Sequence, residues 1–303
     1  MNGVKAEQLT KVYGKEKKIA VDSVSFTVNE GQIFGIIGPD GAGKTSIFRM
    51  LTTLLLPDGG HGYVNGLNVV TDYKAIRSTV GYMPGKFSLY PDLTVEENLN
   101  FFATVFNTTV EDNYSLIKDI YIQIEPFKKR RSGKLSGGMK QKLALCCALI
   151  HKPSVLFLDE PTTGVDPVSR KEFWEMLKKL KQAGITILVS TPYMDEAALC
   201  DRIALMQSGK ILAINSPEGI IRSYPQKLYS STVSNGYSLL KVINRWNTNV
   251  YGYSFGECIH VAAGNEIKID QLSDYLQSQG YHNIRFNHII PTVEDSFIQL
   301  LKN

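Results

Sequence analysis

Short runs of consecutive apolar residues recur along the chain and alternate with segments of helical periodicity. Residues 33–37 and 155–158 form such runs, and 185–189 are mostly apolar. Runs of this length are typical of central strands in a parallel sheet, which are buried on both faces. Between the last two runs, residues 173–180 place apolar side chains on one face of a helix. The alternation predicts an α/β fold with a mainly parallel sheet.

The pattern also divides the chain into two expected domains. Residues 1–218 are predicted to form a large α/β domain whose segment from about 86 to 150 is mainly helical. After Pro217 the composition shifts toward Ser, Asn and Tyr, and residues 219–303 are expected to form a small C-terminal α/β appendage. The helices expected in this appendage span 237–246 and 269–279, and the extended segments span 258–262 and 283–286.

The composition of the chain narrows its expected cellular location and its expected mode of membrane attachment. It has 303 residues, 43% of them hydrophobic, and a formal net charge of +4. We find no signal peptide and no apolar run of bilayer-spanning length, so membrane attachment is expected to be peripheral. The four cysteines lack metal or redox spacing, which favours a reducing cytoplasm. The run 128–131 could meet nucleic acid or anionic lipid, but a solvated face is favoured because aromatic interleaving is lacking.

A glycine-rich loop after the run 33–37 is the strongest chemical signal in the sequence. It comprises Gly38, Pro39, Asp40, Gly41, Ala42, Gly43, Lys44 and Thr45, and Ser46 leads into the next helical segment. The spacing matches a phosphate-binding loop in its strand–loop–helix context. Backbone N–H groups and the helix dipole would hold a phosphate, Lys44 would reach the outer phosphates, and Thr45 would bind Mg²⁺. A glycine turn with an accidental lysine is the weaker alternative.

Two carboxylates end the second apolar run. Asp159 and Glu160 follow residues 155–158, so they should emerge at the carboxyl edge of the sheet, where open α/β folds bind ligands. Asp159 suits Mg²⁺, directly or through water, and Glu160 suits orienting or deprotonating an attacking water. Two solvated acids at a strand end would be the ordinary interpretation of this pair, but the phosphate loop disfavours it.

A second glycine-rich helix start lies upstream of these acids. Ser136 is a plausible N-cap, Gly137 and Gly138 follow it, and apolar residues then repeat at helical spacing. A helix N-terminus of this kind is a second possible anion site. It is equally an ordinary capped helix start, and spacing does not decide between the two.

These motifs, in this order, resemble those of an ATP-binding cassette (ABC) ATPase subunit, nearest to the drug-export type that partners ABC-2-like permeases. The motifs are the phosphate loop, Leu135–Met139 and Leu158–Pro167, and the resemblance covers about residues 4–217 closely. It implies a P-loop NTPase fold with a helical subdomain. It also implies a two-cassette sandwich in which Ser136, Gly137 and Gly138 hold the γ-phosphate bound to the other cassette.

The same resemblance implies roles for two further residues. Tyr13 matches the aromatic residue that stacks on adenine, although it could equally be a packing residue at a strand end. Asp166 matches the loop that crosses the dimer interface beside the catalytic carboxylate. Without the resemblance, Asp166 and Pro167 would be a helix N-cap followed by a first-turn proline, and both roles are compatible.

Two positions depart from the family pattern. Gly85 stands where the family usually has a Gln that contacts Mg²⁺ and the attacking water. Pro192 stands where a His usually contacts the γ-phosphate, and proline offers neither a polar side chain nor a backbone donor. The departures are either tolerated drift in an active enzyme or the mark of a cassette that binds ATP but hydrolyses it poorly. We favour the second interpretation.

The sequence therefore predicts an ATP-binding subunit of an ABC exporter that couples Mg·ATP binding and hydrolysis to a separate permease. The expected partners are an ABC-2-like permease and a second cassette, with a heterodimer favoured and no nucleic acid. The expected location is the cytoplasmic face of the membrane. Two alternatives remain open: a nucleotide-binding regulatory subunit without turnover, and a soluble ABC ATPase that is not part of a transporter.

Overall fold

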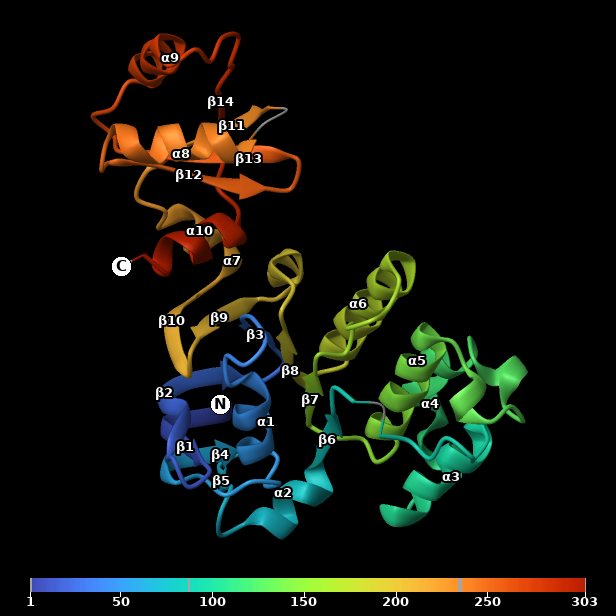
Figure 1. The fold of residues 1–303 in the computed structure, drawn as a ribbon. Helices are drawn as coiled ribbons and strands as arrows, with labels where there is room; N and C mark the ends of the chain where they lie inside the picture. Colours follow the sequence, from blue (N-terminus) through green and yellow to red (C-terminus); the bar gives the residue numbers. More distant parts are fainter. Residues whose placement is uncertain (1, 87, 234–235, 303) are drawn as a thin grey trace. The chain divides into compact units, whose positions relative to one another are not determined.

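The computed structural model describes residues 2–86, 88–233 and 236–302. Phe87, within the expected helical segment, therefore lies outside the described residues. The chain divides into two compact units, residues 1–218 and residues 219–303, which are considered separately below (Figure 1).

A six-stranded sheet forms the centre of the first unit. Its strand order is β10-β9-β3-β8-β7-β6, and only the β10–β9 pair is antiparallel. The strands are β3 (Ile33–Ile37), β6 (Val80–Met83), β7 (Val155–Asp159), β8 (Thr186–Thr191), β9 (Arg202–Gln207) and β10 (Lys210–Asn215). Every residue of β3, β7 and β8 is buried, as the apolar runs predict. The predicted mainly parallel α/β core is thus confirmed.

A second, antiparallel sheet packs against this core. Its order is β2-β1-β4-β5, with strands β1 (Asn2–Tyr13), β2 (Lys18–Asn29), β4 (Gly59–Val64) and β5 (Leu67–Asn68). The rings of Phe26 and Phe34 stack at 5.3 Å and join the two sheets. Helix α1 (Lys44–Leu51) contributes the buried Phe48, whose ring meets Phe157 of β7 edge-on at 5.6 Å. The start of α1 is therefore fixed relative to the end of β7. A short helix, α2 (Tyr73–Thr79), precedes β6.

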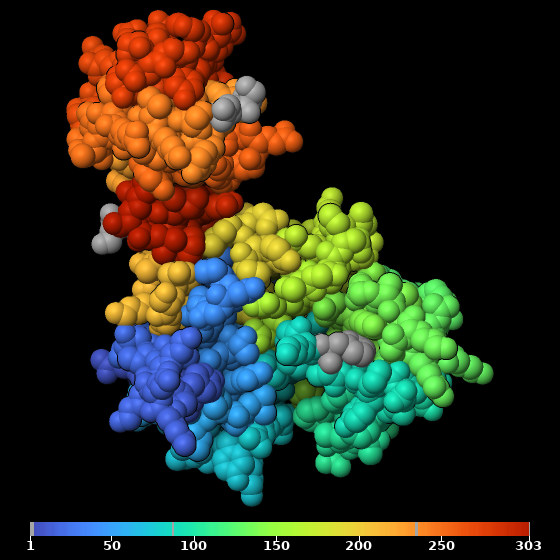
Figure 2. Space-filling view, in the orientation of Figure 1, coloured from blue at the N-terminus to red at the C-terminus, as the bar shows by residue number. Residues whose placement is uncertain are grey.

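Helices account for most of the segment between β6 and β7. They are α3 (Val95–Val105), α4 (Val110–Tyr121) and α5 (Gly137–Leu149), with 3₁₀ turns η1 (Glu125–Phe127) and η2 (Ser132–Lys134) between the last two. Capping boxes start α3 at Thr94 and α4 at Thr109, which explains why both helices begin there. Figure 2 shows this segment, cyan-green to green, as a filled lobe of the first unit. After β7 come α6 (Pro167–Gln182) and, beyond β8, η3 (Met194–Leu199).

The second unit is an antiparallel α/β domain. Helix α7 (Pro217–Arg222) leads into it, and the following elements are β11 (Lys227–Thr232), α8 (Gly236–Trp246), β12 (Val250–Phe255), β13 (Cys258–Ala263), α9 (Ile269–Ser278), β14 (Asn287–Ile289) and α10 (Val293–Leu300). The strand order β12-β13-β11-β14 is that of a β-α-β-β-α-β motif. Helices α8 and α9 pack on one sheet face through Leu239, Ile243, Leu272 and Leu276.

One expectation for the second unit is wrong. Residues 283–286 are not a strand, because Asn283 has a φ of 62° and the sheet pairing begins only at Asn287. Ile284 and Phe286 instead pack against the core under α8 and α9. Their apolar side chains gave the same pattern that a strand would give.

Three of the four cysteines belong to the core. Cys146, Cys147 and Cys200 are buried, and burial raises the pKa of each thiol.

Across the described residues, no helix is long and apolar enough to cross a bilayer. Within the same residues, no group of three His, Cys, Asp or Glu side chains is arranged to hold a metal ion.

Candidate nucleotide-binding site

The glycine-rich loop joins β3 to α1, and its shape depends on the absence of side chains at two positions. Gly43, the residue before α1, has a φ of 107°, and a Cβ there would lie 2.3 Å from the Ala20 carbonyl oxygen. At Gly38 a Cβ would lie 2.1 Å from the Met206 carbonyl oxygen. Only glycine fits such contacts. The loop is therefore held against β9 and the start of β2 with its backbone free to surround an anion.

Lys44 occupies the centre of this loop. Its side chain is 3% exposed, and its amine donates hydrogen bonds to the carbonyl oxygens of Gly38 at 2.8 Å and Pro39 at 3.1 Å. The same amine lies 3.2 Å from a carboxylate oxygen of Glu160. The lysine and the acid that the sequence predicts are thus in direct contact, although 116 positions separate them (160 − 44). An ammonium held in this way is placed to meet the outer phosphates of a nucleotide.

Asp159 and Thr45 face each other beside this pair. The Thr45 hydroxyl donates to the Asp159 carboxylate at 3.2 Å, and Ser190 on the neighbouring strand donates to the same oxygen at 2.5 Å. Asp159 is 3% exposed and lies opposite Ser190 in the parallel register. The contact with Ser190 was not predicted, because nothing in the sequence indicates which strand neighbours β7.

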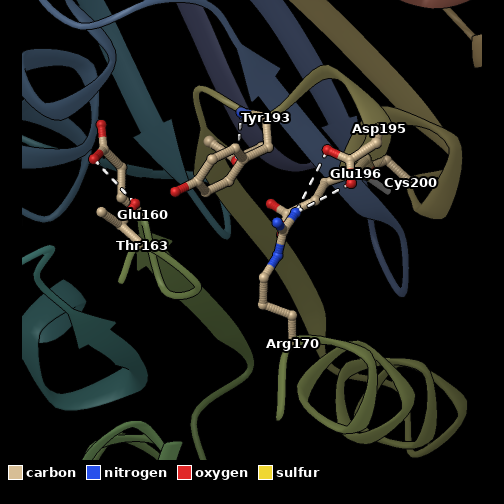
Figure 3. Close-up of polar contacts among 8 residues, drawn as sticks. Glu160, Thr163, Arg170, Tyr193, Asp195, Glu196 and Cys200 are labelled. Carbon is tan, nitrogen blue, oxygen red and sulfur yellow. Dashed lines mark hydrogen bonds and ion pairs between the residues drawn. The ribbon is translucent and has the colours of Figure 1, made fainter. Parts of the chain in front are cut away.

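Glu160 follows β7 in an unusual backbone conformation. Its φ is 50°, a left-handed geometry that is uncommon outside glycine, and it turns the chain sharply after the strand. Its N–H is satisfied by the Ser190 carbonyl at 3.0 Å and the Ser190 hydroxyl at 3.1 Å. The Thr163 hydroxyl donates to its second carboxylate oxygen at 3.5 Å (Figure 3). These contacts hold the carboxylate at the mouth of the phosphate loop.

A cavity of about 520 Å³ joins the phosphate loop to Tyr13. The Tyr13 hydroxyl lies 3.2 Å from that of Ser46, and 40% of the Tyr13 residue is exposed. Gly41, Ala42, Gly43, Lys44, Thr45, Ser46 and Glu160 also line the cavity. It is further lined by residues that sequence reasoning missed, namely Lys18, Ile19, Ala20, Ser208 and Gly209. The last two form the turn between β9 and β10, and only the sheet order brings them here.

The second glycine-rich helix start lies elsewhere, since none of its residues lines this cavity. Ser136 caps α5 by accepting from the Met139 N–H at 3.3 Å, as predicted. A Cβ on Gly138 would lie 2.9 Å from the Ser169 Cβ, so this helix start packs tightly on the first turn of α6. Asp166 caps α6, and the hydrogen bond from the Ser169 N–H lowers the Asp166 pKa.

The two departures from the family pattern lie beside strand ends of the site, Gly85 next to Asp159 and Glu160 and Pro192 directly after β8. A Cβ on Gly85 would lie 3.1 Å from the Asp159 carbonyl oxygen and 3.7 Å from the Glu160 Cβ. Pro192 directly follows β8, whose last residue, Thr191, accepts a hydrogen bond from the Gly38 N–H at 3.2 Å. Neither residue contributes a polar side chain at these places.

A phosphate loop whose lysine contacts a strand-end acid, on a mainly parallel sheet, places the chain in the class of P-loop nucleotide-binding proteins. The chain belongs to the ABC transporter family: residues 21–163 match the family model described as ABC transporter.

Its relatives include proteins named for export. The chain is 39% identical over 288 residues to the "Probable multidrug ABC transporter ATP-binding protein YbhF" of Escherichia coli (strain K12), which covers 94% of the chain and 49% of that protein. The chain therefore spans about half the length of this relative. It is 33% identical over 287 residues to the "Nod factor export ATP-binding protein I" of Rhizobium sp. (strain N33), covering 93% of the chain and 92% of the relative.

Solved structures agree on the fold. One of them is a dimeric, post-hydrolysis state of an ATP-binding cassette bound to ADP and Pi. Its TM-score is 0.64 at 26% identity, and the match covers 70% of this chain and 98% of that one. The predicted family and fold class are both confirmed, and the chain carries an ATP-binding domain of the ABC transporter family.

Proposed function

We propose that this chain binds Mg·ATP and couples its hydrolysis to export through a separate ABC-2-like permease at the cytoplasmic face of a membrane. The contact between the Lys44 amine and Glu160 carries the proposal, because it brings a phosphate-binding cation and a candidate general base to one point. The relatives named for multidrug and Nod factor export support an exporter. The transported compound is set by the permease.

Mg²⁺ fits the oxygen pair formed by Thr45 and Asp159. Their side-chain oxygens are 3.2 Å apart, and the Ser190 hydroxyl donates to the same carboxylate oxygen. Mg²⁺ is usually bound by one or two protein oxygens together with substrate phosphates and water, so a larger cluster of acids is not required. When bound, the ion would neutralise charge on the phosphates. Glu160 would then orient or deprotonate the attacking water.

A second cassette is the proposed partner at the α5 helix start. Ser136 and Gly137 are exposed, and so is Asp166 on the adjoining loop. A Cβ on Gly137 would lie 3.4 Å from the Gly164 carbonyl oxygen, so the two loops form one surface, which also carries Val168 at 69% exposure. Backbone donors of a capped helix, an exposed acid and an apolar side chain suit contact with a nucleotide held by another chain. A heterodimer is favoured.

An apolar cavity of about 350 Å³ is the proposed docking place for the permease. It lies between the sheet core and the helical lobe, with Leu54 and Val105 at its rim, each 56% exposed. Its floor includes Leu89, Phe102 and Cys147. An exposed apolar recess of this kind suits the apolar face of a short helix from a partner protein.

The site of this chain is proposed to be the weaker of the two in the dimer, because Gly85 and Pro192 leave it without two polar groups beside Glu160. Losing one preorganised donor typically lowers kcat by about 10²–10³. The helix start at Ser136, by contrast, is complete and serves the partner's site. The two motifs therefore carry unequal weight in the assembled transporter.

The test compares two variants in the assembled complex. Ser136→Arg places a bulky cation at the partner's phosphate and should nearly abolish ATPase activity, whereas Glu160→Gln should cost far less. Val168→Arg changes another residue on the same exposed surface. If that surface contacts the second cassette, this variant should also lower the ATPase activity of the complex. Robust hydrolysis by a homodimer that is lost on Glu160→Gln would refute the asymmetry. A chain that binds ATP but supports no turnover in any complex would favour a regulatory subunit.

A further inference from the structure

The segment that follows β8 emerges at the phosphate end of the site. β8 lies between β3, which precedes the phosphate loop, and β7, which precedes Glu160. Its last two residues bond to both neighbours: Thr191 accepts from the Gly38 N–H at 3.2 Å, and Ser190 accepts from the Glu160 N–H at 3.0 Å. Pro192 comes next and has no polar side chain. Tyr193 is thus the first residue after β8 that can donate a side-chain hydrogen bond here.

Tyr193 is held in a defined position. Its N–H donates to the Thr191 hydroxyl at 3.1 Å, and the Arg170 guanidinium lies 4.3 Å from its ring centroid. Figure 3 shows the ring between Arg170 on one side and Glu160 with Thr163 on the other, its hydroxyl directed to the Glu160 side. A cation against an aromatic face restrains the ring without using its hydroxyl. The hydroxyl therefore remains available on the side of the ring that faces Glu160.

Arg170 is itself fixed by two acids at the start of η3. Its guanidinium donates to Glu196 at 3.0 and 3.2 Å and to Asp195 at 3.2 Å. Glu196 is 2% exposed, so its carboxylate needs this partner, because an unpaired buried charge is costly. With its charge balanced by two carboxylates, Arg170 is suited to holding the loop rather than to attracting a phosphate.

The cluster also reaches the first turn of α6. The backbone N–H of Arg170 donates to the carbonyl oxygen of Asp166 at 2.9 Å, and Asp166 is the N-cap of α6. Tyr193, Arg170 and Asp166 are therefore linked through one helix turn and one ring contact. A displacement of the Tyr193 ring would therefore also move the first turn of α6, which Asp166 caps.

We propose that the Tyr193 hydroxyl donates a hydrogen bond to the terminal phosphate of a bound nucleoside triphosphate, and that Arg170 is the positioning residue that holds the ring for this contact. The inference deepens the proposed function and rests on it. A neutral phenol is a good donor to an anionic oxygen, and charge-assisted bonds are the stronger class. A diphosphate lacks the group that would be contacted, so the contact distinguishes the two nucleotides.

The test measures the affinities of the full chain for AMP-PNP and for ADP, each with Mg²⁺, by calorimetry. Tyr193→Phe keeps the ring and its cation contact but removes the hydroxyl. Its affinity for AMP-PNP should fall about tenfold or more, in the range of a lost charge-assisted hydrogen bond, with the ADP affinity unchanged. Arg170→Gln should show the same selective loss. Tyr237→Phe, at a tyrosine that is 73% exposed in the second unit, is the matched control and should change neither affinity.

The outcomes separate this inference from the proposed function. An AMP-PNP to ADP affinity ratio in Tyr193→Phe equal to that of the wild type overturns the role of the hydroxyl, while ATP binding itself stands. A selective loss in Tyr193→Phe with no loss in Arg170→Gln overturns the positioning role alone. A wild-type chain that binds neither nucleotide refutes the proposed function, and the inference falls with it.

Discussion

Replacing Lys44 with alanine should weaken Mg·ATP binding by an amount that the structure bounds. The amine is already buried and held by two loop carbonyls, so its desolvation is complete before nucleotide arrives. The variant therefore loses mainly the bond to phosphate, and hydrogen bonds of charged groups are worth about 1.5–3 kcal/mol. At about 1.4 kcal/mol per factor of ten, the Kd for ATP should rise roughly 10- to 150-fold.

A second effect pushes the loss toward the upper end of this range. Lys44→Ala also removes the cation 3.2 Å from Glu160, leaving that carboxylate to face the incoming phosphates. Like charges brought together in a partly buried site repel, because solvent screens them only in part. The double variant Lys44→Ala/Glu160→Gln removes the repulsion and should bind ATP more tightly than Lys44→Ala alone. The difference is the coupling energy of the pair, and contacting residues commonly show such coupling.

The assay is a calorimetric titration of each purified variant with ATP and Mg²⁺, after thermal unfolding has shown that each is folded. Lys178→Ala is the matched control, because Lys178 is an exposed lysine on α6 that pairs with Glu175 at the surface. Unchanged ATP affinity in a folded Lys44→Ala protein would refute the assignment of the phosphate loop. Equal affinities of the single and double variants would refute the repulsion argument but leave the loop assignment intact.

Two further predictions concern the second unit. Deleting residues 219–303 should leave Mg·ATP affinity within about twofold, because none of the described residues that line the nucleotide cavity belongs to this unit; a folded truncated protein that fails to bind ATP would contradict this. Asp295→Asn should destabilise the unit by about 1–3 kcal/mol per buried partner left unpaired. Burial raises the Asp295 pKa, but hydrogen bonds from Tyr253, His260 and Thr292 outweigh it and hold the pKa below 3.8. This stabilisation is therefore complete above about pH 5 and decreases as pH falls through the unfolded pKa of about 3.9 toward the lower folded pKa, so denaturant titrations at pH 7 and at about pH 3 should differ.

The sequence predicted best those features whose causes are local. The runs that became β3, β7 and β8 are apolar at nearly every position, and such strands can only be buried. The N-caps at Ser136 and Asp166 are equally local, since each side chain bonds a backbone N–H three residues later. The phosphate loop belongs to the same group, because its glycines and flanking elements are contiguous.

The features that could not be predicted depend on pairing across long stretches of chain. Ser190 reaches Asp159 only because β8 lies beside β7, and Arg170 meets Glu196 because η3 packs near α6. In the second unit, the Nδ1 of His260 lies 2.7 Å from the Asp295 carboxylate, 35 residues away, and no spacing in the sequence indicates this pair. Periodicity reports which face of an element is buried and not what lies against it.

The first turn of α6 is where the two proposed nucleotide contacts of this chain meet. On one side, Gly138 at the start of α5 packs so closely on Ser169 that a Cβ would lie 2.9 Å from the Ser169 Cβ. On the other side, Arg170 in the same turn stacks on Tyr193. A shift of this turn cannot occur without moving both contacts, because closely packed groups transmit displacement. The surface proposed to meet a second cassette is therefore joined through packed residues to the site around Glu160, and under both proposals a difference between ATP and ADP at Tyr193 would reach this surface through the first turn of α6.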